Sequence, residues 1–257
     1  AAAMAPDAAS AARLGASLVG AAVVHQLWRR FTGSAARAGG ALRPPGAAAG
    51  PRPRPSPAFV AALGETVVVS SAGQAPSGPG GRPTPLIGTH DGTFHCDEAL
   101  ACAMLRMLPE FEGAAVLRSR DPAALEACRI IVDVGAEYDP ARQRFDHHQR
   151  SFGDTMKELQ HATKLSSAGL VYRHFGADVL ARLVGADEAS KIDLAALYKR
   201  VYKNFVEHVD GIDNGIEAHD GAKNYDVTTT LSDRVAALNP RWNEPSDPED
   251  SNARFRA

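Results

Sequence analysis

Short apolar runs alternate with longer segments of helical periodicity from residue 85 onward. Residues 85–89, 114–118 and 129–134 are short and rich in aliphatic side chains, which predicts strands buried on both faces. Between them, apolar positions recur at helical spacing over 97–108, and Asp121-Pro122 is a typical helix start. This alternation predicts an α/β fold with a parallel sheet flanked by helices.

The pattern downstream is mostly helical. Residues 138–147 are expected to be extended, with a turn at Asp139-Pro140. Ser166-Ser167 is expected to cap a helix that runs to about residue 184, and a further helix is expected over 192–209, delivering Asp210 at its end. Functional groups in such sheets gather at the C-terminal ends of the strands, so the residues that follow each predicted strand are the candidates for chemistry.

Composition changes near residue 83 and divides the chain. Residues 1–83 are rich in Ala, Gly, Pro and Ser and contain eight Arg, no Lys and only two acids. This predicts a largely disordered leader over 1–83. Arg-rich, acid-poor leaders resemble mitochondrial transit peptides, which predicts the mitochondrial matrix, with a secretory signal or a merely disordered leader as the alternatives. The apolar run from Leu14 to Val24 is too short to span a bilayer, and no membrane partner is expected.

Charge and cysteine content limit the function classes. The residues after 83 carry 20 basic against 28 acidic side chains, a net charge of about −8. A protein that grips nucleic acid by charge alone should be basic, so this balance argues against a passive binder. It argues less against a nuclease that holds divalent ions, because the ions supply positive charge in the cleft. Three cysteines without paired spacing predict no disulfide framework and favour a reducing compartment.

Four clusters of imidazole and carboxylate groups are the candidate chemistry. They comprise residues 90–98, Asp133 after a strand, residues 146–148 (Asp-His-His) and residues 210–213. Such mixed ligands suit two divalent ions, with Mn²⁺ favoured over Mg²⁺ because several imidazoles are present. No nucleophile elbow and no Walker or Rossmann glycine loop is present, so a metal-activated water is the expected nucleophile.

Individual roles follow from position. Asp133 stands alone on the central strand and is expected to bridge two ions. His90 and His95 flank a glycine-containing loop that can bring both imidazoles to one ion. On a strand, His147 and His148 would point to opposite faces, which predicts a metal ligand and a phosphate contact respectively, unless they are a surface pair.

For several acidic residues, the sequence allows both a functional and a purely structural role. Asp146 could orient His147 by hydrogen bonding. Asp97 could be a ligand or only a helix N-cap, and Glu98 is interpreted as an ordinary first-turn acid. Asp210 and Asp213 could be ligands or only turn aspartates.

The ordered set of motifs resembles the DHH phosphoesterase superfamily, named for the motif at residues 146–148. Within it, the resemblance is closest to the melanocyte-proliferating-gene (Myg) exonuclease family, and it covers residues 84–243. The residues that carry it are Ile87–His90, Phe94–Ala99, Val132–Gly135, Tyr138–Pro140, Phe145–Gln149, Lys164–Leu170 and Val209–Gly215.

The resemblance implies a two-metal site. One ion would be held by His90, His95 and Asp133, and the other by Asp97, Asp133, His147 and Asp210, while His148 would contact phosphate. The catalytic set would be Asp133, Asp146, His147 and His148. The two ions are expected to be Mn²⁺, with Mg²⁺ as the alternative.

The resemblance also implies a function. Members of the family are described as exonucleases that shorten RNA from the 3′ end in mitochondria and nucleus, which predicts a 3′–5′ exoribonuclease acting on single-stranded RNA, with DNA as an alternative substrate. A small-phosphoester hydrolase and an inactive metal-binding domain remain rival hypotheses. Because family members continue further, residues 244–257 are expected to be a truncated tail after the domain at 84–243.

Overall fold

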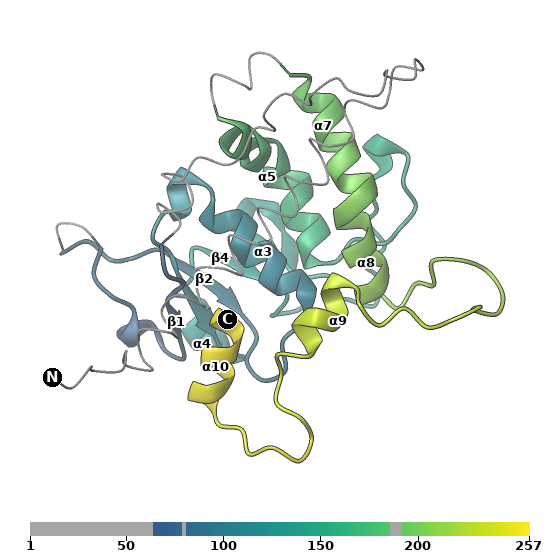
Figure 1. Ribbon diagram of the computed structural model, residues 1–257. Helices are drawn as coiled ribbons and strands as arrows, with labels where there is room; N and C mark the ends of the chain where they lie inside the picture. The colour runs from purple at the N-terminus through teal and green to yellow at the C-terminus, as the bar shows by residue number, and fades with distance from the viewer. Residues whose placement is uncertain (1–63, 79–80, 186–191) are drawn as a thin grey trace, which may run out of the picture.

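The computed structural model describes residues 64–78, 81–185 and 192–257 (Figure 1), and the predicted targeting segment lies outside these ranges. A six-stranded sheet forms its centre, with strand order β1-β3-β2-β4-β6-β5. All neighbouring strands are parallel except β5 and β6. The predicted α/β fold is therefore confirmed. The strands are β1 (Val68–Val69), β2 (Leu86–Thr89), β3 (Ala115–Arg118), β4 (Ile130–Val132), β5 (Tyr138–Asp139) and β6 (Arg144–Phe145).

Alternate strand residues enter two separate cores, as the pleat of a strand requires. Ile87, Ile130 and Val132 join the large core on one face of the sheet. Leu86 and Ile131 join a smaller core on the opposite face. The central strands are therefore apolar at successive positions because both faces are covered, which explains the continuous apolar runs in the sequence.

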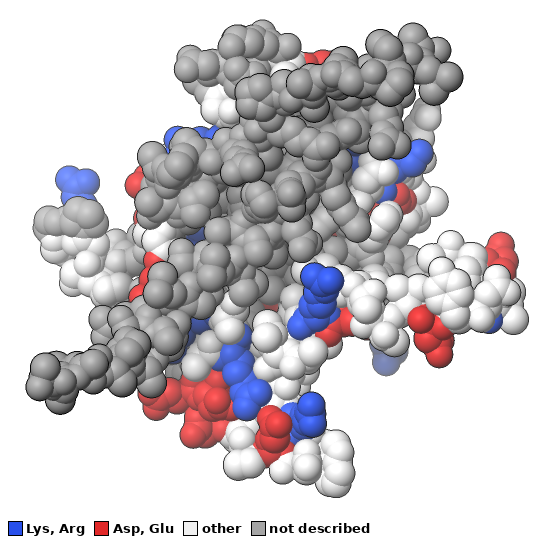
Figure 2. All heavy atoms as spheres, viewed as in Figure 1, with Lys and Arg blue, Asp and Glu red and all other residues white. Residues whose placement is uncertain are grey.

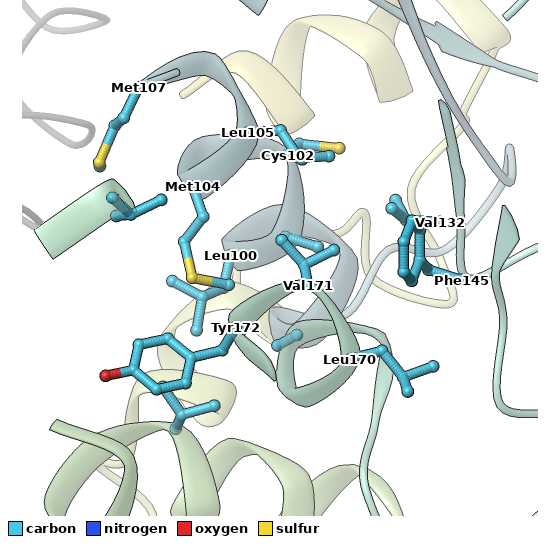
Figure 3. Close-up of a cluster of buried hydrophobic side chains, with 14 of the residues drawn as sticks. Leu100, Cys102, Met104, Leu105, Met107, Val132, Phe145, Leu170, Val171 and Tyr172 are labelled. Atoms are coloured by element: carbon cyan, nitrogen blue, oxygen red, sulfur yellow. The ribbon is translucent and has the colours of Figure 1, made fainter. Parts of the chain in front are cut away.

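Two helices, α3 (Cys96–Arg106) and α5 (Ser167–Val184), pack on the large-core face. Figure 3 shows Leu100 and Met104 of α3 near Val171 and Tyr172 of α5. Burying one such side chain stabilises the fold by roughly 1.5–3 kcal/mol. This packing fixes the N-terminal ends of both helices relative to the sheet. The other face carries the single-turn helix α4 (Pro122–Leu125), whose Asp121 N-cap accepts a hydrogen bond from the amide of Ala123, as predicted from Asp-Pro.

The helices after α5 differ from the prediction at their ends. The expected helix over 192–209 is present as α7 (Leu194–Val201), the π-helical segment η7 (Tyr202–Val206) and α8 (Glu207–Asp213). Because helical hydrogen bonding continues to residue 213, Asp210 lies inside α8 and not at its end. Two further helices are α9 (Leu231–Ala236) and α10 (Pro248–Arg256), and single 3-10 turns span Ala72–Gln74, Pro109–Phe111, Pro140–Arg142 and Lys157–Leu159.

Structure is also found in segments predicted to be a leader and a tail. β1 lies before residue 83, and its Val68 and Val69 pair with Val116 and Leu117 of β3. Two buried valines were too short an apolar run to predict a strand, and pairing with β3 supplies the missing stabilisation. At the other end, α10 packs beside β1, so the described residues 244–257 are part of the folded unit.

Two further properties of the described structure are its lack of a membrane-spanning helix and the state of its cysteines. Within the three described ranges, no helix combines the length and apolar character needed to cross a membrane. Cys96, Cys102 and Cys128 are all buried and unpaired, so the expectation of no disulfide framework agrees with the structure.

Candidate metal centre

The candidate residues lie at the C-terminal ends of three adjacent strands. His90 directly follows β2, Asp133 follows β4 and Asp146 follows β6, and these strands are neighbours in the sheet. The first turns of α3 and α5 lie at the same edge, because Asp97 of α3 is within hydrogen-bonding distance of Ser167 of α5. The parallel sheet therefore brings together groups that are far apart in the sequence, as expected for this class of fold.

Asp133 occupies the middle of this row. Its backbone φ is 57°, a left-handed conformation that side chains other than glycine adopt rarely and that is favoured at functional sites. One carboxylate oxygen, Oδ2, lies 3.3 Å from His90 Nε2. The other, Oδ1, accepts a 3.1 Å hydrogen bond from Ser167 Oγ and lies 3.5 Å from His147 Nδ1. Each carboxylate oxygen thus lies near a different imidazole.

The loop from His90 to His95 supplies two imidazoles, and the helix that follows supplies an unexpected carboxylate. His90, His95, Glu98 and Asp133 each offer one ligand atom, and these atoms lie within 4.8 Å of one another. Glu98 is fully buried, accepts a 2.7 Å hydrogen bond from the His95 amide, and lies 3.2 Å from His90 Nε2. Glu98 is thus a first-turn acid, as predicted, which accepts from the N-cap amide, and in addition its carboxylate faces His90.

These carboxylates control the charge of His90. Burial by itself lowers the pKa of this imidazole, but Asp133 and Glu98 outweigh the burial and raise the pKa to about 10. The free protein therefore holds a proton between the imidazole and two carboxylates. A divalent cation placed here would meet the same negative groups without requiring that proton.

Asp97 lies in the first turn of α3, but it is not the cap. The N-cap position belongs to His95, and the Asp97 side chain is fully buried, with Oδ2 accepting a 3.3 Å hydrogen bond from the Ser167 amide. Burial and the nearby carboxylates of Asp133, Asp213 and Glu98 hold the pKa of Asp97 well above its usual range. The N-cap interpretation is wrong, because the helix begins one residue earlier than predicted.

The Asp-His-His motif splits its two histidines between burial and exposure. His147 is buried, with Nε2 lying 3.0 Å from Asp213 Oδ2 and Nδ1 lying 3.3 Å from Ser167 Oγ. His148 is 60% exposed, and its ring centroid lies 4.3 Å from that of His147. The two rings do not point to opposite faces as predicted, because the strand ends before them, at Phe145.

Asp146 orients a different partner from the one expected. Its Oδ1 lies 2.7 Å from His148 Nδ1, and its Oδ2 accepts a 2.6 Å hydrogen bond from the Ala136 amide. The partner at His147 Nδ1 is instead the hydroxyl of Ser167. Since that hydroxyl donates its proton to Asp133, it accepts from Nδ1–H, and Nε2 of the metal-free protein donates to Asp213 Oδ2. Burial lowers the pKa of His147, but Asp213 and the other nearby carboxylates outweigh it and raise the pKa, and a bound cation would take the place of the Nε2 proton.

Asp210 belongs to none of the clusters of potential metal ligands found among the described residues. It is fully buried, and its Oδ1 accepts hydrogen bonds from the amide and hydroxyl of Ser166, at 3.0 and 2.8 Å. Its Oδ2 accepts a 3.1 Å hydrogen bond from the Tyr202 hydroxyl. The close approach requires Gly169, where a Cβ would overlap both carboxylate oxygens. Ser166 thus binds Asp210, and its side chain does not cap α5 as expected.

The residues present fit divalent cations. Three groups meet the spacing of a metal site in the described structure: His90, His95, Glu98 and Asp133; Asp133, Asp146, His147 and His148; and Asp97, His147 and Asp213. Asp97 Oδ1 and Glu98 Oε2 are buried oxygens without a hydrogen-bond partner among the described residues. Buried oxygens of this kind are normally satisfied, so they suit cation ligands. Sequence reasoning left Glu98 and Asp213 without a firm role and gave Ser167 only a helix cap.

A cleft of about 400 Å³ opens onto this centre. It is lined by His90, His95, Arg120, Asp133, Val134, Gly135, Ala136, Asp146 and His148. Arg120 lies at its exposed side and is 63% exposed, with Nε 3.3 Å from Asp91 Oδ1. Within the described residues, the Arg120 side chain makes no other hydrogen bond or ion pair.

Comparison with known proteins adds the family. The MYG1_exonuc family model, described as Uncharacterised protein family (UPF0160), matches residues 86–257. The chain belongs to this family. It is 56% identical over 177 residues to the MYG1 exonuclease of Bos taurus and to that of Homo sapiens, covering 67% of this chain and 46% of each relative. It is 48% identical over 159 residues to MYG1 protein C694.04c of Schizosaccharomyces pombe, covering 61% of this chain and 48% of that relative.

The matched region of this MYG1_exonuc member includes the strands β2 to β6 and the metal-type groups described above. The chain spans about half the length of the curated relatives it matches. No solved structure matches the chain.

Proposed function

We propose that this chain carries the active site of a metal-dependent phosphodiesterase that acts as a 3′–5′ exoribonuclease. The observation that carries the proposal is the position of Asp133, which belongs to two adjoining groups of potential metal ligands. A carboxylate shared in this way can hold two cations close together, as two-metal hydrolases require. The relatives named MYG1 exonuclease support the nuclease class.

In such a reaction, some of the side chains would bind the metal ions and others would contact the substrate. Divalent ions of the Mn²⁺ or Mg²⁺ type, when bound, would activate a water and stabilise charge on the phosphate. His90, His95, Glu98 and Asp133 would hold one ion, and Asp97, Asp133, His147 and Asp213 the other. His148 is held by Asp146 through Nδ1, and its Nε2 has no partner among the described residues. We therefore assign His148 to contact with the substrate phosphate at the cleft.

The choice of single-stranded RNA and of the 3′ end is inferred from the family resemblance. On the face shown in Figure 2, acidic and basic side chains lie next to one another along the lower edge, and its described part has no broad basic patch. Because the residues after 83 carry 20 basic against 28 acidic side chains, affinity would depend on the metal centre more than on surface charge. Action in the mitochondrial matrix and the nucleus belongs to the same proposal.

Hydrolysis of 5′-labelled single-stranded RNA by the whole chain with Mn²⁺ tests the proposal. A ladder that shortens from the 3′ end is expected, and it should be absent when residues 146–148 are replaced by Ala. His219→Ala, a change at an exposed histidine outside the cleft, is the matched control. Cleavage of dinucleotides without cleavage of long RNA would support a small-phosphoester hydrolase. Metal binding without turnover of either substrate would contradict the proposed activity of this chain.

Arg120 gives a prediction about substrate binding. Replacing Arg120 by Gln removes an exposed guanidinium that lines the cleft, while the groups of potential metal ligands stay intact. A charge-assisted hydrogen bond to phosphate contributes roughly 1.5–3 kcal/mol, so we expect KM for RNA to rise about tenfold with little change in kcat. Steady-state kinetics on labelled RNA measures both constants. Arg129→Gln, which removes an exposed guanidinium at the start of β4, should leave KM unchanged. An unchanged KM in Arg120→Gln would show that Arg120 does not touch substrate.

A further inference from the structure

The loop that carries His90 and His95 is held from outside by side chains distant in sequence. Its tip is exposed, and Gly92 has φ +81°, so the loop is not fixed by regular secondary structure. Arg118 donates from Nε to the His90 carbonyl at 3.3 Å and from Nη2 to the Gly92 carbonyl at 2.6 Å. The main chain just before His95 is therefore tied to the end of β3.

Asn239 holds the same loop at its other end. Its Oδ1 accepts a 3.0 Å hydrogen bond from the Phe94 amide, and its Nδ2 donates a 2.7 Å hydrogen bond to the Phe94 carbonyl. A carboxamide that satisfies both main-chain groups of one residue fixes its peptide planes in orientation as well as in position. Asn239 follows α9, which is far from the loop along the chain.

The guanidinium of Arg118 also joins the loop to α10. It is 2% exposed, and its Nη1 donates to Ser251 Oγ at 3.0 Å and to Asn252 Oδ1 at 3.2 Å. Its Cζ lies 5.4 Å from the centroid of the Phe94 ring and 4.8 Å from that of Phe255. A buried cation is costly unless its donors are satisfied. Here the acceptors are loop carbonyls and α10 side chains, and aromatic faces add cation–π attraction.

We propose that Arg118 and Asn239 are positioning residues that fix the main chain of residues 90–95, so that His90 and His95 converge on one divalent ion. The inference rests on the proposed metal centre. It makes residues 239–255 part of that centre, although none of them is placed among the ligand groups. An arginine is required at position 118, because only a planar fork reaches two carbonyls and two α10 side chains at once.

Calorimetric titration with Mn²⁺ tests the proposal on Arg118→Lys and Asn239→Asp. Lysine keeps the charge but loses the fork, and aspartate keeps the acceptor for the Phe94 amide but faces the Phe94 carbonyl with a second oxygen. We expect one of two Mn²⁺ equivalents to weaken by about tenfold or more and the other to be unchanged. Arg129→Lys and Asn204→Asp, the same changes at exposed positions outside the cleft, are the controls. Asn239 is only half-buried, so its variant should fold even if Arg118→Lys does not.

A combined substitution separates positioning from general stability. In a His95→Ala background, Arg118→Lys should cause a smaller further loss of Mn²⁺ affinity than in the parent, because the loop then delivers only the His90 imidazole. An equal loss in both backgrounds, or Mn²⁺ binding by both variants that matches the controls, would overturn the proposal.

Hydrogen exchange of residues 90–95 in the metal-free protein provides a readout that does not depend on Mn²⁺. The exchange should be faster in both variants than in the controls. Unchanged exchange would show that Arg118 and Asn239 do not hold the main chain of residues 90–95. If the parent chain binds no Mn²⁺, the proposed function fails and the role in metal binding fails with it. The exchange data would still show whether Arg118 and Asn239 hold the loop.

Discussion

Asp133→Asn is expected to abolish RNA hydrolysis while the fold is retained. Asparagine tolerates the left-handed backbone found at this position about as well as aspartate does, so the strand end should be undisturbed. The change removes the one negative charge shared by two ligand groups. Removing a single group that stabilises charge in the transition state lowers kcat by roughly 10²–10³-fold, and removing a ligand shared by two ions should lower it further.

Three measurements check this expectation together. Labelled RNA reports hydrolysis, circular dichroism reports the fold, and thermal unfolding with and without Mn²⁺ reports ion binding. Bound Mn²⁺ should raise the unfolding midpoint of the parent but raise that of Asp133→Asn much less. Without metal, the variant should be less stable than the parent near pH 7, because Asp133 stabilises the protonated imidazole of His90. Asp178→Asn, at an exposed position on α5, is the control. Hydrolysis at the parent rate would remove Asp133 from the mechanism.

The fold could be predicted because the central strands are covered on both faces. Ile87, Ile131 and their neighbours form continuous apolar runs. Short runs of this kind that alternate with helical segments are typical of a parallel sheet covered by helices. The position of the site followed from the same logic, since chemistry gathers at strand ends. β1 escaped prediction because a two-residue edge strand is specified by its partner and not by its own sequence.

The internal contacts of the site could not be predicted, because side-chain direction is decided by tertiary packing. Glu98 and a solvent-exposed first-turn acid look the same in sequence, yet the packing of α3 against α5 turns Glu98 inward. Ser166 and Ser167 look like a helix cap, but Asp210 and Asp133 compete for their hydroxyls. Arg118 and Asn239 gave no signal, since their partners are main-chain groups.

Asp210 and Asp213 show this limit most directly. They are three residues apart on α8, so they lie on neighbouring positions of one helix face, and spacing cannot separate them. The family resemblance implies that Asp210 is the ligand. In the structure, Asp210 is occupied by Ser166 and Tyr202, while Asp213 lies 3.0 Å from His147 and is grouped with Asp97. The geometry therefore favours Asp213 for the metal.

Matched substitutions to Asn should separate the two aspartates. Asp213→Asn is expected to lower hydrolysis by roughly 10²-fold or more, because it removes a charge that faces His147. Asp210→Asn should keep hydrolysis within a few-fold of the parent. Its carbonyl oxygen can accept from Ser166, and its amide can donate to the Tyr202 hydroxyl, so the hydrogen bonds survive. The reverse pattern, with Asp210→Asn inactive and unable to bind Mn²⁺, would show that the assignment implied by the resemblance is correct.

Stability against pH gives Asp210→Asn a second, independent result. Burial raises the pKa of Asp210 to about 7, although hydrogen bonds from Ser166 and Tyr202 act in the opposite direction. The unfolded chain releases this proton near pH 4 and the folded chain near pH 7, so between these values ionisation favours unfolding. The parent should lose stability across that window, by up to about 4 kcal/mol, and the loss should level off above it. Asp210→Asn lacks the ionisation, so its free energy of unfolding, measured with urea in EDTA, should increase relative to the parent's as pH rises from 4.5 to 7.5. A difference that does not change with pH would mean that Asp210 is already ionised in the folded protein at low pH, as a carboxylate exposed to a permanent cation would be.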